Sequence, residues 1–113
     1  MIDLKEFTPP ARALRTDVPS GFPESGEGAL IDNDRVRVWD VTMRPGGGLP
    51  THYHGYDMVV VVLEGGTVVF RTEDGREERT IWEYKDVAFI AGGVAHSEDV
   101  VSGTPRVMVF ELK

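Results

Sequence analysis

Short runs of β-forming residues, separated by turn signals, fill the chain from residue 29 to its end. Valine, isoleucine, threonine and aromatic residues favour strands, and no stretch shows sustained helical periodicity. Glycine, asparagine and aspartate mark turns between the runs, at 32–34, 45–48, 64–66, 73–75, 92–93 and 102–103. So many short strands with regular turns predict an all-β sandwich or barrel.

The pattern predicts strands at 30–31, 35–43, 57–63, 67–72, 79–84, 87–90 and 106–112. The segment 58–63 is apolar on both faces, which is typical of a strand covered on each side. For the last strand the alternation leaves two inward faces open: Val107, Val109 and Glu111, or Met108, Phe110 and Leu112.

The first 28 residues differ from the rest, because they contain four prolines and three glycines without a strand or helix period. We expect an extended N-terminal arm at 1–28, which packs on its own barrel or on a partner subunit, and one barrel domain at 29–113. Exposed strand edges of a small barrel need cover, so a homodimer to which the arm contributes is the default expectation.

The net charge of −7 argues against binding to nucleic acid or to an anionic membrane surface, since both need a basic patch. No apolar stretch reaches the roughly 18 residues of a membrane span, and the N-terminus lacks the order of a secretory signal. A cytoplasmic location is therefore expected. The absence of cysteine excludes disulfides, thiolate ligands and a cysteine nucleophile.

The histidines of the chain are His52, His54 and His96, and two of them stand two residues apart before an apolar strand. Side chains at i and i+2 of a strand point to the same face, so His52 and His54 can share a ligand. A third imidazole from another strand would complete three corners of a metal coordination sphere.

The residues around this pair resemble the first motif of the cupins, which are double-stranded β-helix (jelly-roll) barrels that hold a metal inside. Gly46, His52, His54 and Gly65 all fall in register with that motif. The position at which the motif has a glutamate is occupied by Met58.

The second cupin motif is matched more weakly, by Gly93 and His96. Its remaining positions are occupied by Lys85, Ala91 and Val100. The two motifs stand in the right order, and the resemblance covers about 29–113. It implies the cupin fold, and the segment HYHGYDMVVV is also similar to short cupins associated with β-alanine degradation.

Carried over residue by residue, the resemblance implies metal binding by the three histidines but not by Met58. Asp57 stands one residue earlier, where a strand side chain points to the opposite face. Three neutral imidazoles resemble the iron centres of thiol and diketone-cleaving dioxygenases, so Fe²⁺ is favoured as the divalent ion, with Zn²⁺, Ni²⁺ or Mn²⁺ as alternatives.

Other residues are candidates for the site by their position in the pattern. Met58, Val60 and Phe70 are expected to line an apolar pocket. Glu98, two residues after His96, is a candidate for an outer carboxylate that orients an imidazole. Tyr56 is the candidate for a catalytic side chain.

The sequence supports three hypotheses about function. The leading hypothesis is a non-haem iron dioxygenase-like enzyme that acts on a small anionic metabolite. The second is a non-catalytic cupin that binds a small molecule or a metal as a sensor or accessory protein. The third is a metal-dependent isomerase or lyase without redox chemistry.

Overall fold

The computed structural model describes residues 29–46 and 48–113, and these contain strands but no helix. The strands are β1 (Ile31–Asp32), β2 (Val36–Thr42), β3 (Gly48–His54), β4 (Asp57–Thr72), β5 (Glu77–Trp82), β6 (Val87–Ile90) and β7 (Val94–Leu112). The all-β prediction is confirmed. No helix in this part of the chain could span a membrane. The predicted arm at 1–28 lies outside the described residues.

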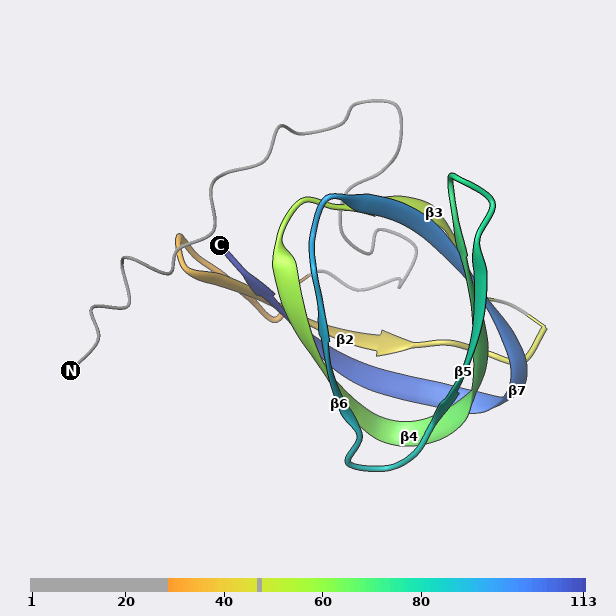
Figure 1. The fold of residues 1–113 in the computed structure, drawn as a ribbon. Coiled ribbons are helices and arrows are strands. Elements are labelled where there is room, and N and C mark those ends of the chain that lie inside the picture. The colour runs from red at the N-terminus through yellow and green to blue at the C-terminus, as the bar shows by residue number, and fades with distance from the viewer. Residues whose placement is uncertain (1–28, 47) are drawn as a thin grey trace.

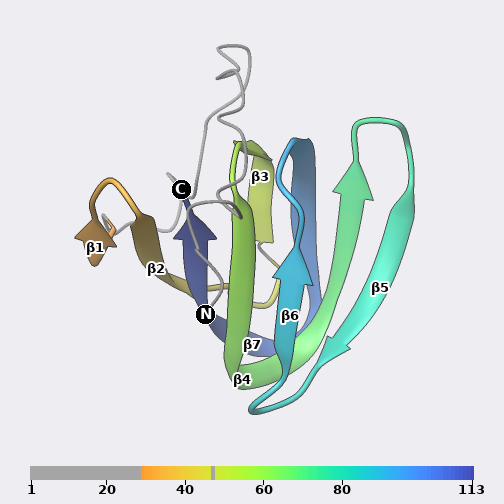
Figure 2. The same cartoon turned by 60° about the vertical axis from the view of Figure 1, so that its left-hand side comes forward.

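Two long antiparallel strands, β4 and β7, pair along most of their lengths and organise the fold. Strand β2 pairs with the second half of β7, and β3 pairs with its first half. Strands β6 and β5 pair in the same way with the two halves of β4. The long strands therefore bend the sheet around a common interior, as Figures 1 and 2 show.

Both bends contain glycines that the sequence pattern assigned to turns, and those two turn predictions are wrong. β4 runs through 64–66 and β7 runs through 102–103, with shifts of register between the two strands. Gly66 lies opposite Gly103, and a Cβ atom on Gly66 would come within 2.6 Å of the Ser102 carbonyl oxygen. Gly103 also has a φ of 79°. These glycines allow two bulged strands to approach each other closely.

Elsewhere the predicted strands agree with the structure within about two residues, apart from two segments. Strand 87–90 matches β6, and the separate strands predicted at 57–63 and 67–72 are the two halves of β4. β3 and the first half of β7 were not predicted as strands. Their residues include glycine, proline, histidine and acidic residues, so pairing with neighbouring strands overrides weak local preference.

The barrel interior is filled by apolar side chains from β2 to β5 and from β7, with one residue directly after β2. Its buried members are Val41, Met43, Leu49, Met58, Val60, Val62, Val68, Trp82, Val100, Val107 and Val109. On β7 the inward face is the one with Val107, Val109 and Glu111, which settles the alternative left open by the sequence.

A buried ion pair accompanies this core, because Glu111 is fully buried. Arg37 donates two hydrogen bonds of 3.0 Å to the two carboxylate oxygens of Glu111. The Trp39 indole N–H donates a further bond to the same carboxylate. The carboxylate charge is thus compensated inside the barrel by a guanidinium and an indole donor.

Candidate metal centre

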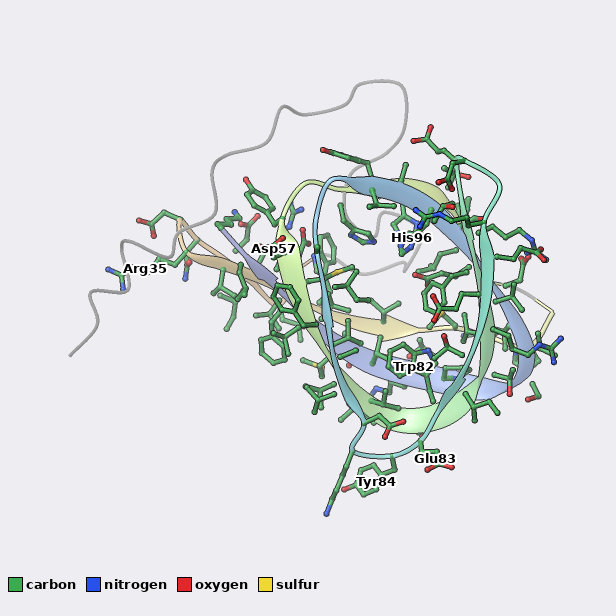
Figure 3. The ribbon with its side chains drawn as sticks, in the orientation of Figure 1. Arg35, Asp57, Trp82, Glu83, Tyr84 and His96 are labelled. Carbon is green, nitrogen blue, oxygen red and sulfur yellow. The ribbon has the colours of Figure 1, made fainter. Side chains whose placement is uncertain are left out.

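The fold brings the three histidines together inside the barrel. His52 and His54 lie on β3 and point to the same face, and His52 lies directly opposite His96 of β7. All three side chains are buried, with exposures of 2%, 2% and 7%. Figure 3 shows His96 inside the ring of strands.

The Nε2 atoms of the three rings converge. His96 Nε2 lies 2.9 Å from His54 Nε2 and 3.1 Å from His52 Nε2. His52 Nδ1 lies 2.7 Å from the Pro50 carbonyl oxygen, which can only accept a hydrogen bond. The neutral His52 ring therefore carries its proton on Nδ1 and directs the Nε2 lone pair at the other rings, as in metal-binding histidines.

A carboxylate joins the cluster from β7. The Oε1 atom of Glu98 lies 3.2 Å from His96 Nε2 and 4.0 Å from His52 Nε2. Four candidate ligand atoms, from the three histidines and Glu98, lie within 4.8 Å of one another. Imidazole nitrogens with one carboxylate oxygen form a donor set that suits a divalent transition-metal ion, so these residues could hold one.

The position of Glu98 differs from the sequence-based expectation in one respect. An outer partner would contact the Nδ1 atom of a ligand histidine, whereas Glu98 faces the same Nε2 atoms that converge on the centre. The spacing of two residues between His96 and Glu98 could have indicated this placement, because residues 96 and 98 share one face of a strand.

Burial controls the protonation of the cluster. Desolvation is the main cause that lowers the pKa of His54 to about 2 and of His96 to about 4, and the pKa of His52 is also lowered. Neighbouring histidines add to the effect at His54 and His96. Burial raises the pKa of Glu98 to about 8. The imidazoles are therefore neutral at physiological pH, as metal ligands must be.

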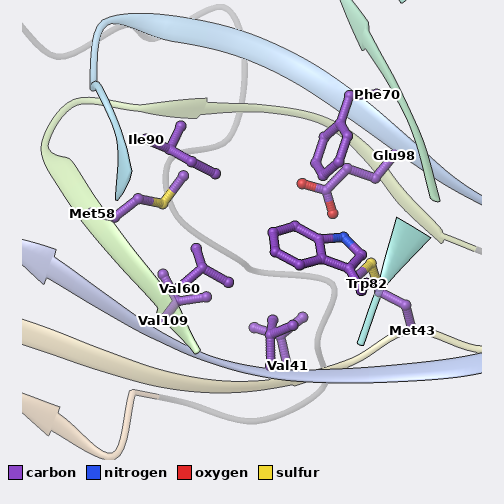
Figure 4. A pocket seen from close by; sticks show the side chains of 10 residues that line it. Val41, Met43, Met58, Val60, Phe70, Trp82, Ile90, Glu98 and Val109 are labelled. Carbon is purple, nitrogen blue, oxygen red and sulfur yellow. The ribbon is translucent and has the colours of Figure 1, made fainter. Parts of the chain in front are cut away.

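The expected lining residues Met58, Val60 and Phe70 border a small interior cavity of about 20 Å³. Glu98 and Trp82 border it as well, and Figure 4 shows the Glu98 carboxyl group pointing between Phe70 and Trp82. This volume is room for about one water-sized molecule. The interior beside the cluster is mainly apolar.

A larger groove of about 750 Å³ reaches His54 and His96 from outside. Its inner walls include Phe70, Trp82 and Ile90, which also border the small cavity. Charged and polar residues of the β4–β5 hairpin stand at the groove, among them Arg76, Glu77 and Glu78. A groove of this size is in the range of small-molecule sites.

Tyr56 and Asp57 do not join the cluster. The Tyr56 ring lies 6.0 Å from Lys113 Nζ and lines neither the cavity nor the groove. The Asp57 carboxylate accepts a hydrogen bond of 2.8 Å from the Gly92 backbone N–H. Asp57 thus ties the start of β4 to the segment before β7.

No known family model matches the chain, but individual proteins do. BauB of Pseudomonas aeruginosa, a β-alanine degradation protein, is 31% identical over 91 residues, covering 80% of this chain and 93% of BauB. A cupin domain from Bordetella pertussis is 30% identical, with a TM-score of 0.68 and coverage of 85% of this chain and 96% of that chain.

A cupin with a double-stranded β-helix fold from Methanocaldococcus jannaschii is 14% identical, with a TM-score of 0.63. The match covers 75% of this chain and 76% of that one. At this identity the likeness concerns the fold alone. The expected double-stranded β-helix is thereby confirmed.

Proposed function

Because this chain belongs to the cupin superfamily, we propose that its buried histidines bind a divalent metal and that it is a non-haem iron dioxygenase-like enzyme for a small anionic metabolite. The observation that carries the proposal is the convergence of His52, His54 and His96 through their Nε2 atoms. The groove that reaches two of these rings supports access by a small molecule.

The donor set is compatible with several divalent ions. Imidazole nitrogens suit iron, nickel and zinc, and the carboxyl group of Glu98 would also suit manganese. Ferrous iron is the ion that we propose, and metal analysis distinguishes it from the others.

When bound, ferrous iron would supply Lewis acidity and one-electron chemistry toward dioxygen. A dioxygenase places both oxygen atoms in its substrate and needs no external reductant. His52, held by Pro50, would fix the orientation of the centre, and the apolar walls with Phe70 and Ile90 would exclude bulk water. A substrate in the groove would approach from the side of His54 and His96.

The name of the Pseudomonas relative directs the choice of substrates. That protein is described as a β-alanine degradation protein. Small amino-acid derivatives, including those of β-alanine, therefore belong in the first assays, with small thiols and β-dicarbonyls beside them.

A non-catalytic metal- or ligand-binding cupin is the second candidate, and Glu98 favours it. With Glu98 the candidate ligand set has four members, and a closed set of four protein ligands is typical of structural sites. A non-redox isomerase or lyase would use the same residues without consuming oxygen.

Metal analysis of untagged protein, followed by oxygen-electrode assays of the iron-loaded form, separates these functions. Near-stoichiometric iron and substrate-dependent oxygen uptake, both lost in His96→Ala, are the expected results. Bound zinc or nickel without oxygen uptake would favour the binder or the non-redox enzyme. A metal-free protein that also fails to bind added metal would contradict both enzymes and the metal binder, and would leave the small-molecule binder.

We also propose a cytoplasmic homodimer. Strands β5 and β6 each pair only with β4 among the described strands, and they expose Ile81, Val87 and Phe89. Apolar side chains on open sheet edges favour cover by a partner. Light scattering of the purified full chain measures the oligomeric state, and a monomer at all concentrations would contradict the dimer.

A further inference from the structure

The indole of Trp82 has a buried N–H group without a hydrogen-bond partner among the described residues. Trp82 ends β5 and is only 8% exposed. Buried polar groups in native proteins nearly always have a partner, so a group that lacks one needs an explanation. The other tryptophan shows the usual arrangement, because Trp39 donates to Glu111.

Trp82 lies where the interior cavity and the outer groove meet. It borders the interior cavity together with Glu98, and it borders the outer groove together with His54 and His96. Phe70, whose ring centroid is 6.4 Å from that of Trp82, borders both hollows too. In Figure 4 the indole nitrogen lies on the side of the ring toward Glu98. A molecule that entered by the groove would therefore pass the indole.

An indole N–H can only donate a hydrogen bond, so its partner must offer an acceptor. The surrounding walls are apolar apart from Glu98, so the partner must also tolerate contact with Phe70 and Ile90. A carbonyl oxygen on a small carbon skeleton meets both conditions. The cavity of about 20 Å³ has room for such an atom, or for one water in its place.

We propose that Trp82 is a ligand-binding residue whose indole N–H donates to the carbonyl oxygen of a small oxo acid held in the groove. The proposal rests on the proposed metal function in one respect, because the carboxylate of the ligand would be held at the histidine cluster. Trp82 then selects ligands with a carbonyl oxygen beside the carboxylate. Phe70 and Ile90 limit their size and polarity.

Nuclear magnetic resonance of the ¹⁵N-labelled full chain tests this directly, since its two tryptophans give two indole N–H signals. Spectra of Trp39→Phe and Trp82→Phe assign the signals. The chain is titrated with pyruvate, and with isobutyrate as a matched acid that has a methyl group in place of the ketone oxygen. Both titrations are made with zinc, which prevents turnover, and without metal.

Pyruvate is expected to shift the Trp82 indole signal, whereas the Trp39 signal, held by Glu111, stays in place. Isobutyrate should leave the Trp82 N–H shift nearly unchanged. Trp82→Phe should weaken pyruvate binding roughly threefold to tenfold, as expected for the loss of one hydrogen bond, and leave isobutyrate binding the same.

The proposal is overturned if pyruvate up to its solubility limit leaves the Trp82 signal in place with and without zinc. In that case a bound water is the partner of the indole. Equal weakening of both acids in Trp82→Phe would also overturn it, because it would indicate lost packing. Metal content measured on the same samples reports separately on the histidine site.

Discussion

Glu98 and His96 stand two residues apart on β7, and their side chains meet inside the barrel at a distance of 3.2 Å between Oε1 and Nε2. The carboxylate of the candidate centre therefore comes from the same strand as its third histidine. Met58 occupies the position of the usual cupin glutamate. From β4 it borders the interior cavity that Glu98 also borders. In this chain the carboxyl group comes from β7, and a thioether side chain stands at the position on β4.

Glu98→Gln tests whether this carboxylate takes part in metal binding. The substitution keeps the size of the side chain but removes the carboxyl group that would lose its proton and bind the metal, so metal affinity is expected to fall about tenfold or more. Competition with a chelator at neutral pH measures the affinity, and circular dichroism verifies the fold.

A second substitution makes this test specific. Met58→Glu in the Glu98→Gln background returns a carboxylate to the cavity from β4 and is expected to restore most of the lost affinity. Unchanged affinity in Glu98→Gln alone would show that Glu98 is not a ligand and that the histidines act without it.

The metal-free protein is expected to lose stability as the pH falls below about 6.5. The pKa values of His54 and His96 in the folded state, about 2 and about 4, lie below their ordinary values, so the unfolded chain binds protons first. Their contribution to the free energy of unfolding is fully present above pH 6.5. Each histidine loses up to about 1.4 kcal/mol of this contribution per pH unit as the pH falls toward its pKa in the folded state.

Urea unfolding of metal-free protein between about pH 7 and pH 5 measures this slope. His54→Asn removes one of the groups and should flatten it. Glu98 acts in the opposite direction, because its carboxyl group ionises more readily in the unfolded chain than in the folded protein. Its effect lowers the free energy of unfolding as the pH rises from 4.5 to about 8. An identical slope in His54→Asn would show that the buried imidazole titrates normally.

The sequence indicated the fold through alternation and turn residues, but it could not distinguish a glycine turn from a glycine bulge. Gly65, Gly66 and Gly103 carry the same local signal as the true turn at Gly75. What separates them is long-range contact that leaves no room for a Cβ atom. Gly66 and Gly103 lie where β4 approaches β7, and Gly65 lies against the Trp82 carbonyl group at the end of β5. Such contacts are a property of the whole fold.

The candidate site, like the fold, could be predicted from the sequence only in part. The spacing of His52 and His54 predicted a shared face, and the structure also brings His96 to them. Tyr56 was named from parity along the chain, but it lies between β3 and β4, outside both strands, and its ring lies near Lys113. The binding potential of Trp82 could not be predicted, because an unpartnered indole is visible only when its surroundings are known.

Removal of one partner from the buried ion pair between Arg37 and Glu111 is expected to destabilise the protein more than breaking an exposed ion pair. Removing one partner of a buried pair costs about 3–5 kcal/mol, since the other charge stays buried without compensation. The Arg37 side chain keeps 22% exposure, so Glu111→Ala should lower the free energy of unfolding by about 3 kcal/mol.

The pair between Arg106 and Asp40 is the matched control for this prediction. It has the same two-bond geometry, with distances of 3.0 and 2.6 Å, but its arginine is 45% exposed. Asp40→Ala should therefore cost about 0–1 kcal/mol. Equal losses in the two variants, measured by urea unfolding, would contradict the role assigned to burial.

Gly48 controls the approach of β3 to β7 and hence the position of the histidines. A Cβ atom at this residue would lie 1.9 Å from the Glu98 carbonyl oxygen, which is backbone and cannot move aside alone. Gly48→Ala must therefore displace β3 next to the strand positions that align His52 with His96. We expect a loss of about 1–3 kcal/mol in the free energy of unfolding and weaker metal binding.

Gly55→Ala is the control, because its added Cβ would meet only a Tyr53 ring carbon at 3.5 Å. This substitution lies beside His54 and is closer in sequence to the site than Gly48, yet it should leave stability and metal affinity nearly unchanged. Urea unfolding and chelator competition on both variants measure the difference. If Gly48→Ala binds metal as tightly as Gly55→Ala, the alignment of β3 on β7 does not limit the assembly of the centre.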